Sequence, residues 1–360
     1  MMDTTDIEIN FDEFGVCNHC HEYKQEKNKI ISNLDDRKKS LQDTLQKIKL
    51  AGNGKKYDCI VGISGGVDSS YVAYLAKNFG LRALLVHLDN GWDSELAVKN
   101  VENITTYTGF DLYTLVINWE EFKDIQRSFF NADVIDLELI SDHAIFATVY
   151  KLARKYDTKF LLSGDNFVTE AIMPKSWNWR KSDATNIKAI HNKFGQQRLK
   201  TFPFMSTLKK TIYQYSGVAQ SIHILDYLEE YNKDKVINIL ESEIGWRYYG
   251  GKHYESLFTR FYQGYILPKK FYIDKRRAHL STLINSGQTT RDKALEELEC
   301  NTYPIELQNA DFDLVCKKLD FTKDELNDYI NRKERHHLFY KSDEKIYKTL
   351  KFFYSIFKKK

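Results

Sequence analysis

Proline is rare in this chain, and no apolar run is long enough to cross a membrane. Only 4 of the 360 residues are proline, which disfavours long disordered linkers. A membrane-spanning helix needs roughly 20 consecutive apolar residues, and the sequence contains no such run. The acidic, polar start MMDTTDIEIN also lacks the basic and apolar regions of a signal peptide. We therefore expect a cytoplasmic protein with no transmembrane segment.

The sequence also has no large excess of either charge, and its number of cysteines is odd. Lys and Arg number 53 against 50 Asp and Glu, a formal net charge of +3, so the composition gives no strong case for nucleic-acid binding. Five cysteines, an odd number without an export signal, indicate a reducing compartment and no disulfide framework. Hydrophobic residues make up 42% of the chain, enough for a substantial core in one large domain or two of ordinary size.

The most informative stretch, from Tyr57 to Leu75, reads YDCIVGISGGVDSSYVAYL. Its apolar run Cys59–Ile63 predicts a buried parallel strand, and Val67–Ala76 has the apolar spacing of a helix. The glycines between them let the backbone approach phosphate oxygens, and the helix N-terminus adds a positive partial charge. The stretch has neither the Gly-x4-Gly-Lys of a Walker loop nor the Gly-x-Gly-x-x-Gly of a dinucleotide site. It therefore predicts another kind of anion site, with an ordinary glycine turn before a helix as the alternative.

Asp68 is unusual in an anion site because a carboxylate repels phosphates. It fits if it holds a bridging Mg²⁺ or caps the turn. SGGVDSS after a strand resembles the loop of the PP-loop ATP pyrophosphatases, which include GMP synthetase, asparagine synthetase and the tRNA thiolation and lysidine enzymes. That family splits ATP between its α and β phosphates and activates a carbonyl-type oxygen as an adenylate, which implies ATP and Mg²⁺ as cofactors. The resemblance predicts these nucleotide contacts: Gly62, Ile63, Ser64, Gly65, Gly66, Val67, Asp68, Ser69 and Ser70.

Strands and helices alternate beyond the loop. Apolar runs at 83–88, 111–117 and 159–162 predict further strands, which indicates a doubly wound α/β parallel sheet with ligands at the carboxyl ends of its strands. Further site residues are expected at that edge: His87, Asp89, Gly164 and Asp165 for the nucleotide, and Glu170 as a catalytic residue. The alternative for each of them is an ordinary cap or turn residue. We predict a Cys-containing segment and helix at 1–50, a PP-loop domain at 51–200 and a mainly helical substrate or partner region at 201–360.

Cys17 and Cys20 form one half of a zinc knuckle, whose metal needs four ligands. His19 or His21 could contribute, because the other three cysteines are scattered and form no second pair. The same string matches a c-type haem attachment site, which requires export that nothing in the sequence directs. Zn²⁺ at Cys17 and Cys20 is one interpretation, and a pair of unligated thiols is the other.

Two later stretches could contact a second substrate. The loop at 173–180, MPKSWNWR, carries Trp177 and Trp179, whose rings suit stacking on a sugar or a base, or packing at the surface. The segment 245–279 is rich in Arg, Lys, His and Tyr, which indicates contact with phosphates or, alternatively, a solvated surface. The tail at 345–360 interleaves aromatic residues with lysines and could pack on the core, on a partner or on a membrane surface.

Several motifs together resemble one branch of this family, the N-acetyl sugar amidotransferases of bacterial surface-polysaccharide synthesis (lipopolysaccharide O-antigen or capsule). The resemblance spans about Phe11 to Glu299. It rests on FDEFGVCNHC, VHLDNGWDS, LSGDN, MPKSWNW, NIKAIHNKFG, LKTFP, GWRYYGGKHYESLFTRFYQGYILPKKF and DKRRAHLSTLINSGQ. Members usually carry a further Cys-x2-Cys before the DTTD-like stretch, so we expect the zinc site to be incomplete in this chain.

The resemblance implies a reaction of the C–N ligase type. The acetamido oxygen of a nucleotide-activated N-acetyl sugar attacks the α-phosphate of ATP, and ammonia then displaces AMP from the imidate to leave an acetamidino group. Positioning and neutralisation of phosphate charge would carry the catalysis. The predicted catalytic residues are Ser64, Asp68, Glu170, Lys252 and Arg277. The predicted substrate-binding residues are Trp177, Trp179, Arg247, His253, Arg260, Lys275 and Arg276.

The ammonia is expected to come from a second protein. A glutaminase needs an activated thiolate, at an N-terminal Cys or in a strained Gly-x-Cys-x-Gly elbow, and no cysteine of this sequence has that context. We therefore expect a partner glutaminase, as the resemblance also implies. Two alternatives share the loop: a PP-loop tRNA-modifying enzyme of the thiolation or lysidine type, and a non-catalytic nucleotide-binding subunit of a glycan-synthesis complex.

Overall fold

The computed structural model describes residues 1–30, 34–251 and 254–357, and its centre is a five-stranded parallel sheet. The strands are β1 (Cys59–Gly62), β2 (Ala83–Asp89), β3 (Asp111–Val116), β4 (Phe160–Ser163) and β5 (Gln220–His223). Their order is β3-β2-β1-β4-β5, and every neighbouring pair is parallel. The strand order reverses at β1, so ligands are expected beside the carboxyl ends of β1 and β4. The predicted doubly wound sheet is confirmed.

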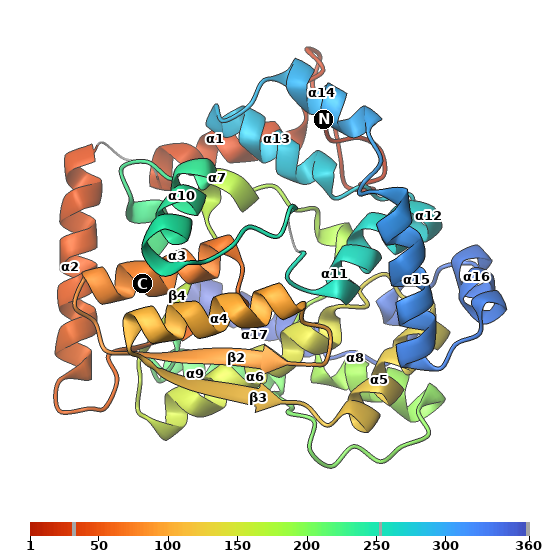
Figure 1. Cartoon of the computed structure of the whole chain (residues 1–360), viewed down its shortest axis with the longest axis horizontal. Coiled ribbons are helices and arrows are strands. Elements are labelled where there is room, and N and C mark those ends of the chain that lie inside the picture. The colour runs from red at the N-terminus through yellow and green to blue at the C-terminus, as the bar shows by residue number, and fades with distance from the viewer. Residues whose placement is uncertain (31–33, 252–253, 358–360) are drawn as a thin grey trace.

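Helices cover both faces of this sheet (Figure 1). One layer contains α2 (Leu34–Gly52), α3 (Val67–Asn78), α4 (Glu95–Thr108) and α10 (Lys233–Ile244), and the other contains α6 (Leu139–Lys155) and α9 (Thr207–Tyr215). Along β1, Cys59 and Val61 pack with the α3 layer, whereas Ile60 packs with the α6 layer. Successive side chains of a strand point to opposite faces, so a run that is apolar throughout suits a sheet covered on both sides.

A further hydrophobic core joins the N-terminal segment, α5 and much of the C-terminal helical region. The remaining α-helices are α1 (Asn18–Ile30), α5 (Trp119–Ala132), α7 (Phe167–Glu170), α8 (Ala184–Phe194), α11 (Leu257–Phe261), α12 (Leu267–Phe271), α13 (Arg276–Ser286), α14 (Arg291–Glu299), α15 (Ile305–Leu319), α16 (Lys323–Asn331) and α17 (Glu344–Phe357). A π-helical turn, Tyr262–Ile266, joins α11 to α12. Among the described residues, no helix is both long and apolar enough to cross a bilayer.

The structure corrects the expected end of the sheet. Four strands were predicted, and the fifth, β5, lies at the edge and pairs with β4. Its sequence, QSIH, is mostly polar and mostly exposed, so no apolar run marks it. The sheet therefore extends beyond residue 200, where the PP-loop domain was expected to end, and the described residues after 201 include the strand β5.

The C-terminal region attaches beside the carboxyl end of β2. Ser94 donates its backbone N–H to the carbonyl of Glu255 at 2.9 Å, and Leu257 donates its own to the carbonyl of Trp92 at 2.8 Å. Asp93 and Ser256 form an antiparallel bridge between these two bonds. This contact brings the start of α11 to the edge of the sheet where ligands are expected.

Candidate active site

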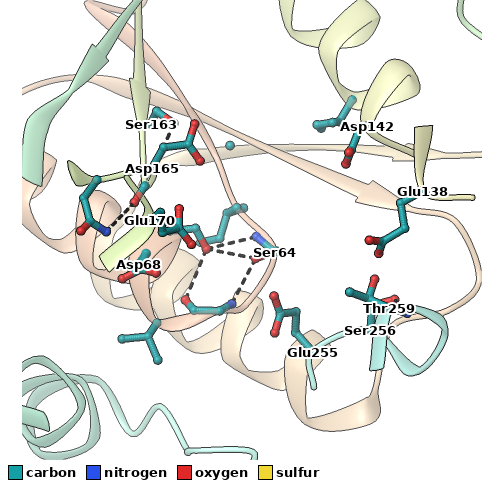
Figure 2. A pocket seen from close by; sticks show the side chains of 18 of the residues that line it. Ser64, Asp68, Glu138, Asp142, Ser163, Asp165, Glu170, Glu255, Ser256 and Thr259 are labelled. Atoms are coloured by element: carbon teal, nitrogen blue, oxygen red, sulfur yellow. Dashed lines mark hydrogen bonds between the residues drawn. The ribbon is translucent and has the colours of Figure 1, made fainter. Parts of the chain in front are cut away.

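A cavity of about 1040 Å³ lies at the carboxyl ends of the strands. Figure 2 shows Ser64, Asp68, Asp165 and Glu170 on one side, and Glu138, Asp142, Ser256 and Thr259 on the other. The predicted site residues that line it are Gly62, Ile63, Ser64, Gly66, Val67, Asp68, Ser69, His87, Gly164, Asp165, Glu170 and Lys275. Most of the expected nucleotide contacts are thus brought together.

The loop between β1 and α3 requires glycine at Gly65. Its φ of +82° lies in the left-handed region, and a Cβ there would stand 2.4 Å from the carbonyl oxygen of Ala97. Behind the loop, the Gly65 carbonyl accepts from the buried indole of Trp246 at 3.0 Å. Ser70 is fully buried and does not line the cavity. The loop is therefore fixed from behind by its neighbours, while Gly66 forms the N-cap of α3.

Backbone amides of the loop are held by hydroxyl groups. Ser64 N–H donates to Ser69 Oγ at 3.3 Å, and Gly66 N–H donates to Ser64 Oγ at 3.2 Å. Val67 N–H, at the start of α3, donates to the hydroxyl of Tyr249 at 3.3 Å. Amides at a helix N-terminus favour anions, so these positions suit the oxygens of a phosphate group.

Asp68 lies on the first turn of α3 and lines the cavity. One of its carboxylate oxygens, Oδ1, accepts from the hydroxyl of the buried Tyr231. Asp165 and Glu170 lie on the same side of the cavity, on the loop after β4 and on α7 (Figure 2). Mg²⁺ in nucleotide sites is usually held by one or two carboxylates together with substrate phosphates. These carboxylates therefore suit Mg²⁺ carried by a nucleotide.

His87, at the end of β2, connects the loop to the C-terminal attachment. Its Nδ1 lies 2.9 Å from the Ile63 carbonyl, and its Nε2 lies 3.3 Å from Asp93 Oδ2. Burial alone would lower the pKa of His87, but Asp93 and the Ile63 carbonyl raise it above its ordinary value. Asp89, the other predicted residue on β2, lines a neighbouring cavity of about 430 Å³ and accepts from Gly91 N–H.

The side of the cavity away from the loop is polar. Gln263 donates to Glu138 at 2.9 Å, and Lys275 lies 3.9 Å from the same carboxylate. The sequence reasoning missed Glu138, Glu255, Thr259 and Gln263, all of which line the cavity. Three of them fall inside the quoted GWRYYGGKHYESLFTRFYQG motif, which was a usable signal. No sequence signal pointed to Glu138, because it is an isolated acidic residue just before α6.

The two predicted stacking tryptophans do not line the cavity. Trp177 is fully buried, and its indole donates to the Thr5 carbonyl at 3.3 Å. Trp179 stacks on His337 with ring centroids 5.0 Å apart and donates to Asp183 at 3.0 Å. Both rings therefore support the core, which corrects the prediction that they bind substrate.

Several predicted arginines also lie away from the cavity. Arg260 forms a bidentate ion pair with Asp311, at 2.8 and 2.7 Å. Arg276 pairs with Asp274 and donates to nearby backbone carbonyls, and Arg277 pairs with Asp3 at 2.9 Å. Arg260 and Arg276 thus pair within the helical region, and Arg277 pairs with the N-terminal segment. The structure therefore does not place them in the cavity, which corrects the predicted catalytic role of Arg277 and the predicted substrate contacts of Arg260 and Arg276.

The remaining predicted site residues are Arg247, Lys252 and His253. Arg247 has an exposed side chain, and only its backbone is tied to the site, through hydrogen bonds with Asn100. It does not line the cavity, which corrects its predicted substrate contact. Lys252 and His253 lie outside the described residues.

The structure gives no support for a zinc site at Cys17 and Cys20. Their sulfurs lie 3.5 Å apart, but the two nearby histidines have other partners. His19 contacts Asp6 at 2.7 Å, and His21 contacts Asp12 at 2.8 Å. Within the described ranges, no three His, Cys, Asp or Glu side chains are placed to hold a metal ion.

Two protein families match separate parts of the chain. Residues 58–166 match the asparagine synthase family, and residues 255–354 match the family described as LPS biosynthesis protein WbpG-like, C-terminal domain. The first match covers the loop and four strands of the sheet. The second begins at Glu255, where the C-terminal region attaches beside β2.

Individual relatives match only in part. An uncharacterized protein of Methanocaldococcus jannaschii is 32% identical over 108 residues, which cover 30% of this chain and 37% of that protein. The tRNA(Ile)-lysidine synthase of Chlamydia pneumoniae is 37% identical over 77 residues, which cover 20% of this chain and 24% of that enzyme. The chain therefore spans well under half the length of these relatives. The NH3-dependent NAD synthetase of Campylobacter jejuni superposes with a TM-score of 0.32 at 11% identity, over 59% of this chain and 84% of that one.

Proposed function

Since the chain belongs to the PP-loop proteins with a WbpG-like C-terminal domain, we propose that it is an ATP-dependent amidotransferase of lipopolysaccharide or other surface-glycan synthesis. Its acceptor is a nucleotide-activated N-acetyl sugar, and the product carries an acetamidino group in place of the acetamido group. One observation supports this proposal most strongly. The loop at 62–69 lines the same cavity as three residues from the start of the WbpG-like region, Glu255, Ser256 and Thr259.

ATP would bind with its phosphates at the loop. The positive partial charge at the N-terminus of α3 would help to neutralise the leaving pyrophosphate. Mg²⁺ bound between the phosphates and Asp68, Asp165 or Glu170 would supply further charge neutralisation there. Adenine would lie against the apolar wall of the cavity, which is formed by Val86, Ile145, Val149 and Leu161.

The acceptor sugar would occupy the side formed by the WbpG-like region. Glu138, Thr259 and Gln263 offer carboxylate, hydroxyl and amide groups for sugar hydroxyls. The acetamido oxygen would then face the α-phosphate across the cavity and form the adenylated imidate, with loss of pyrophosphate. An amide is a poor electrophile, and adenylation converts its oxygen into a good leaving group. Ammonia attacks the imidate carbon and releases AMP.

The ammonia would be delivered by a partner glutaminase. Cys59 lies within the buried β1, where burial raises the pKa of its thiol far above the range of an active nucleophile. Cys316 is also buried, and burial raises the pKa of its thiol too. Cys300 is exposed at the end of α14 and lies in no strained elbow. These three cysteines therefore offer no glutaminase centre.

Two other functions share the loop. The match to tRNA(Ile)-lysidine synthase favours tRNA modification, but it covers only 20% of this chain, while the 255–354 match points to glycan synthesis. A non-catalytic nucleotide-binding subunit would not need the carboxylates that face the loop.

Incubation of the protein with ATP, Mg²⁺, an ammonium salt and a panel of nucleotide N-acetyl sugars tests the proposal. AMP and pyrophosphate should form only when a sugar is present, and the sugar should exchange one oxygen for one nitrogen. AMP formation that requires tRNA instead of a sugar would favour the tRNA-modifying alternative, and no turnover with either would favour the non-catalytic one.

A further inference from the structure

The segment 246–251 lies beside the phosphate loop and is hydrogen-bonded to it and to α4. The buried indole of Trp246 donates to the Gly65 carbonyl at 3.0 Å. Asn100, on α4, accepts from the N–H of Arg247 and donates to its carbonyl, each at 2.9 Å. Two successive residues of the segment are thus fixed to the loop and to α4, which sets the position of the residues that follow.

Tyr249 extends from this anchored segment into the cavity. Its hydroxyl accepts from the N–H of Val67 at 3.3 Å, and a Cβ placed on Gly66 would lie 3.4 Å from the same oxygen. Ser64 and Ser69, the other hydroxyl acceptors of loop amides, belong to the loop itself. Tyr249 lies about half of the chain away from these serines in sequence, but its hydroxyl likewise accepts from an amide of the loop region.

We propose that Tyr249 is a phosphate-binding residue of the nucleotide site, whose hydroxyl accepts from Val67 N–H and donates its own proton to an oxygen of the pyrophosphate group. A hydroxyl can accept one hydrogen bond and donate another at the same time. The hydroxyl would therefore stand between the Val67 amide and the phosphate and present one neutral donor to the phosphate. The inference rests on the proposed function only in taking ATP as the ligand of the loop.

The surroundings of Tyr249 favour a hydroxyl that keeps its proton. Burial, and then the neighbouring Glu255 and Asp68 carboxylates, raise the pKa of Tyr249. An ionised oxygen at this point would repel phosphate, whereas a protonated one donates to it. The sequence predicts phosphate contacts by basic residues of the segment 245–279, and Tyr249 would add a neutral donor from the same segment.

Titration of inorganic pyrophosphate, with Mg²⁺, into the wild-type protein and the Tyr249→Phe variant tests the assignment. The change keeps the ring that fills the space and removes the hydroxyl alone. We expect about tenfold weaker binding of pyrophosphate, which corresponds to about 1.4 kcal/mol. Tyr248→Phe is the matched control, because this adjacent side chain is 39% exposed and does not line the cavity. Equal unfolding midpoints for the two variants would exclude a folding defect.

Pyrophosphate binding by Tyr249→Phe within twofold of wild type would overturn the assignment. Tighter binding would overturn it as well, since the hydroxyl would then compete with phosphate for the Val67 amide. Binding is measured without a sugar, so it is independent of the acceptor. A wild-type protein that binds pyrophosphate through Tyr249 but forms no AMP with any nucleotide sugar would refute the proposed function and leave this inference intact.

Discussion

Individual residues of the phosphate loop are restricted by close contacts and by backbone conformation. Gly65 combines a positive φ with an approach to the Ala97 carbonyl that leaves no room for a Cβ. Gly62, at the end of β1, has open space at the same position. The two glycines thus differ in how much substitution they should tolerate.

Gly65→Ala should destabilise the fold and distort the loop. A non-glycine residue in a sparsely populated backbone region costs about 1–3 kcal/mol, and the contact with Ala97 adds to that cost. Urea unfolding of Gly65→Ala and Gly62→Ala would measure the difference. Equal stability of the two variants would show that the loop does not need the left-handed conformation.

Asp68 should be essential because it lines the cavity from the first turn of α3, where the proposed nucleotide phosphates would bind. Asp68→Asn keeps an acceptor for the Tyr231 hydroxyl and removes the charge that would hold Mg²⁺. Loss of such a transition-state contact typically lowers the rate by a factor of about 10²–10³, which steady-state AMP formation would measure. Tyr231→Phe, which retains the Asp68 carboxylate, should lower the rate of AMP formation much less. If Asp68→Asn turned over at the wild-type rate, the carboxylate would have no catalytic part.

Among the structural elements, those with strong apolar periodicity were predictable. The strands β1 to β4 and the helix α3 lie where their apolar patterns predict them. β5 was missed because an edge strand needs little apolar surface, and QSIH supplies little. Trp177 was misassigned because a polar loop sequence does not reveal that its indole is buried under the N-terminal segment.

The short 3₁₀-helix His337–Phe339 should make the stability of the fold sensitive to acid, because it carries a buried histidine. Its ring is buried, donates from Nδ1 to Asn186, accepts at Nε2 from Asp136 N–H, and stacks on Trp179. Burial lowers the pKa of His337 to about 3, against about 6.5 in the unfolded chain. Between these values the unfolded state binds a proton that the native state does not, so stability falls by about 1.4 kcal/mol for each pH unit of acidification.

Urea unfolding between pH 7 and pH 5 would measure this slope in the wild type and in His337→Gln. The variant should be less stable at pH 7 but should lose stability less steeply toward pH 5. Burial also lowers the pKa of His143, and that contribution is common to both proteins. An identical slope in the two proteins would contradict the assignment of a neutral, buried His337.

At the scale of the whole molecule, the site is built from segments that lie far apart in the sequence. The loop after β1, the residues after β4 and the start of the WbpG-like region meet at one edge of the sheet. The loop side was predictable because its chemistry is concentrated in one short motif. The other side was not, because Glu138 and the residues of α11 are brought to the cavity by the backbone pairing of Ser94 with Glu255 and of Trp92 with Leu257.

The molecule should use free ammonia but not glutamine. AMP formation by the single protein should rise with ammonium concentration and with pH, because a larger fraction of ammonium is then neutral NH₃. Glutamine should give no turnover until a glutaminase is added. Glutamine-dependent AMP release by the pure protein would contradict the proposal of a partner.

The central claim is that the acetamido oxygen of a nucleotide sugar attacks the α-phosphate of ATP, and the fate of that oxygen tests it most directly. A nucleotide N-acetyl sugar labelled with heavy oxygen in its acetamido carbonyl would be incubated with the protein, ATP, Mg²⁺ and ammonium, and the AMP analysed by mass spectrometry. The adenylated imidate predicts that the label moves to the phosphate of AMP, one atom for each acetamidino group formed. AMP that remains unlabelled while the acetamidino sugar accumulates would contradict the account.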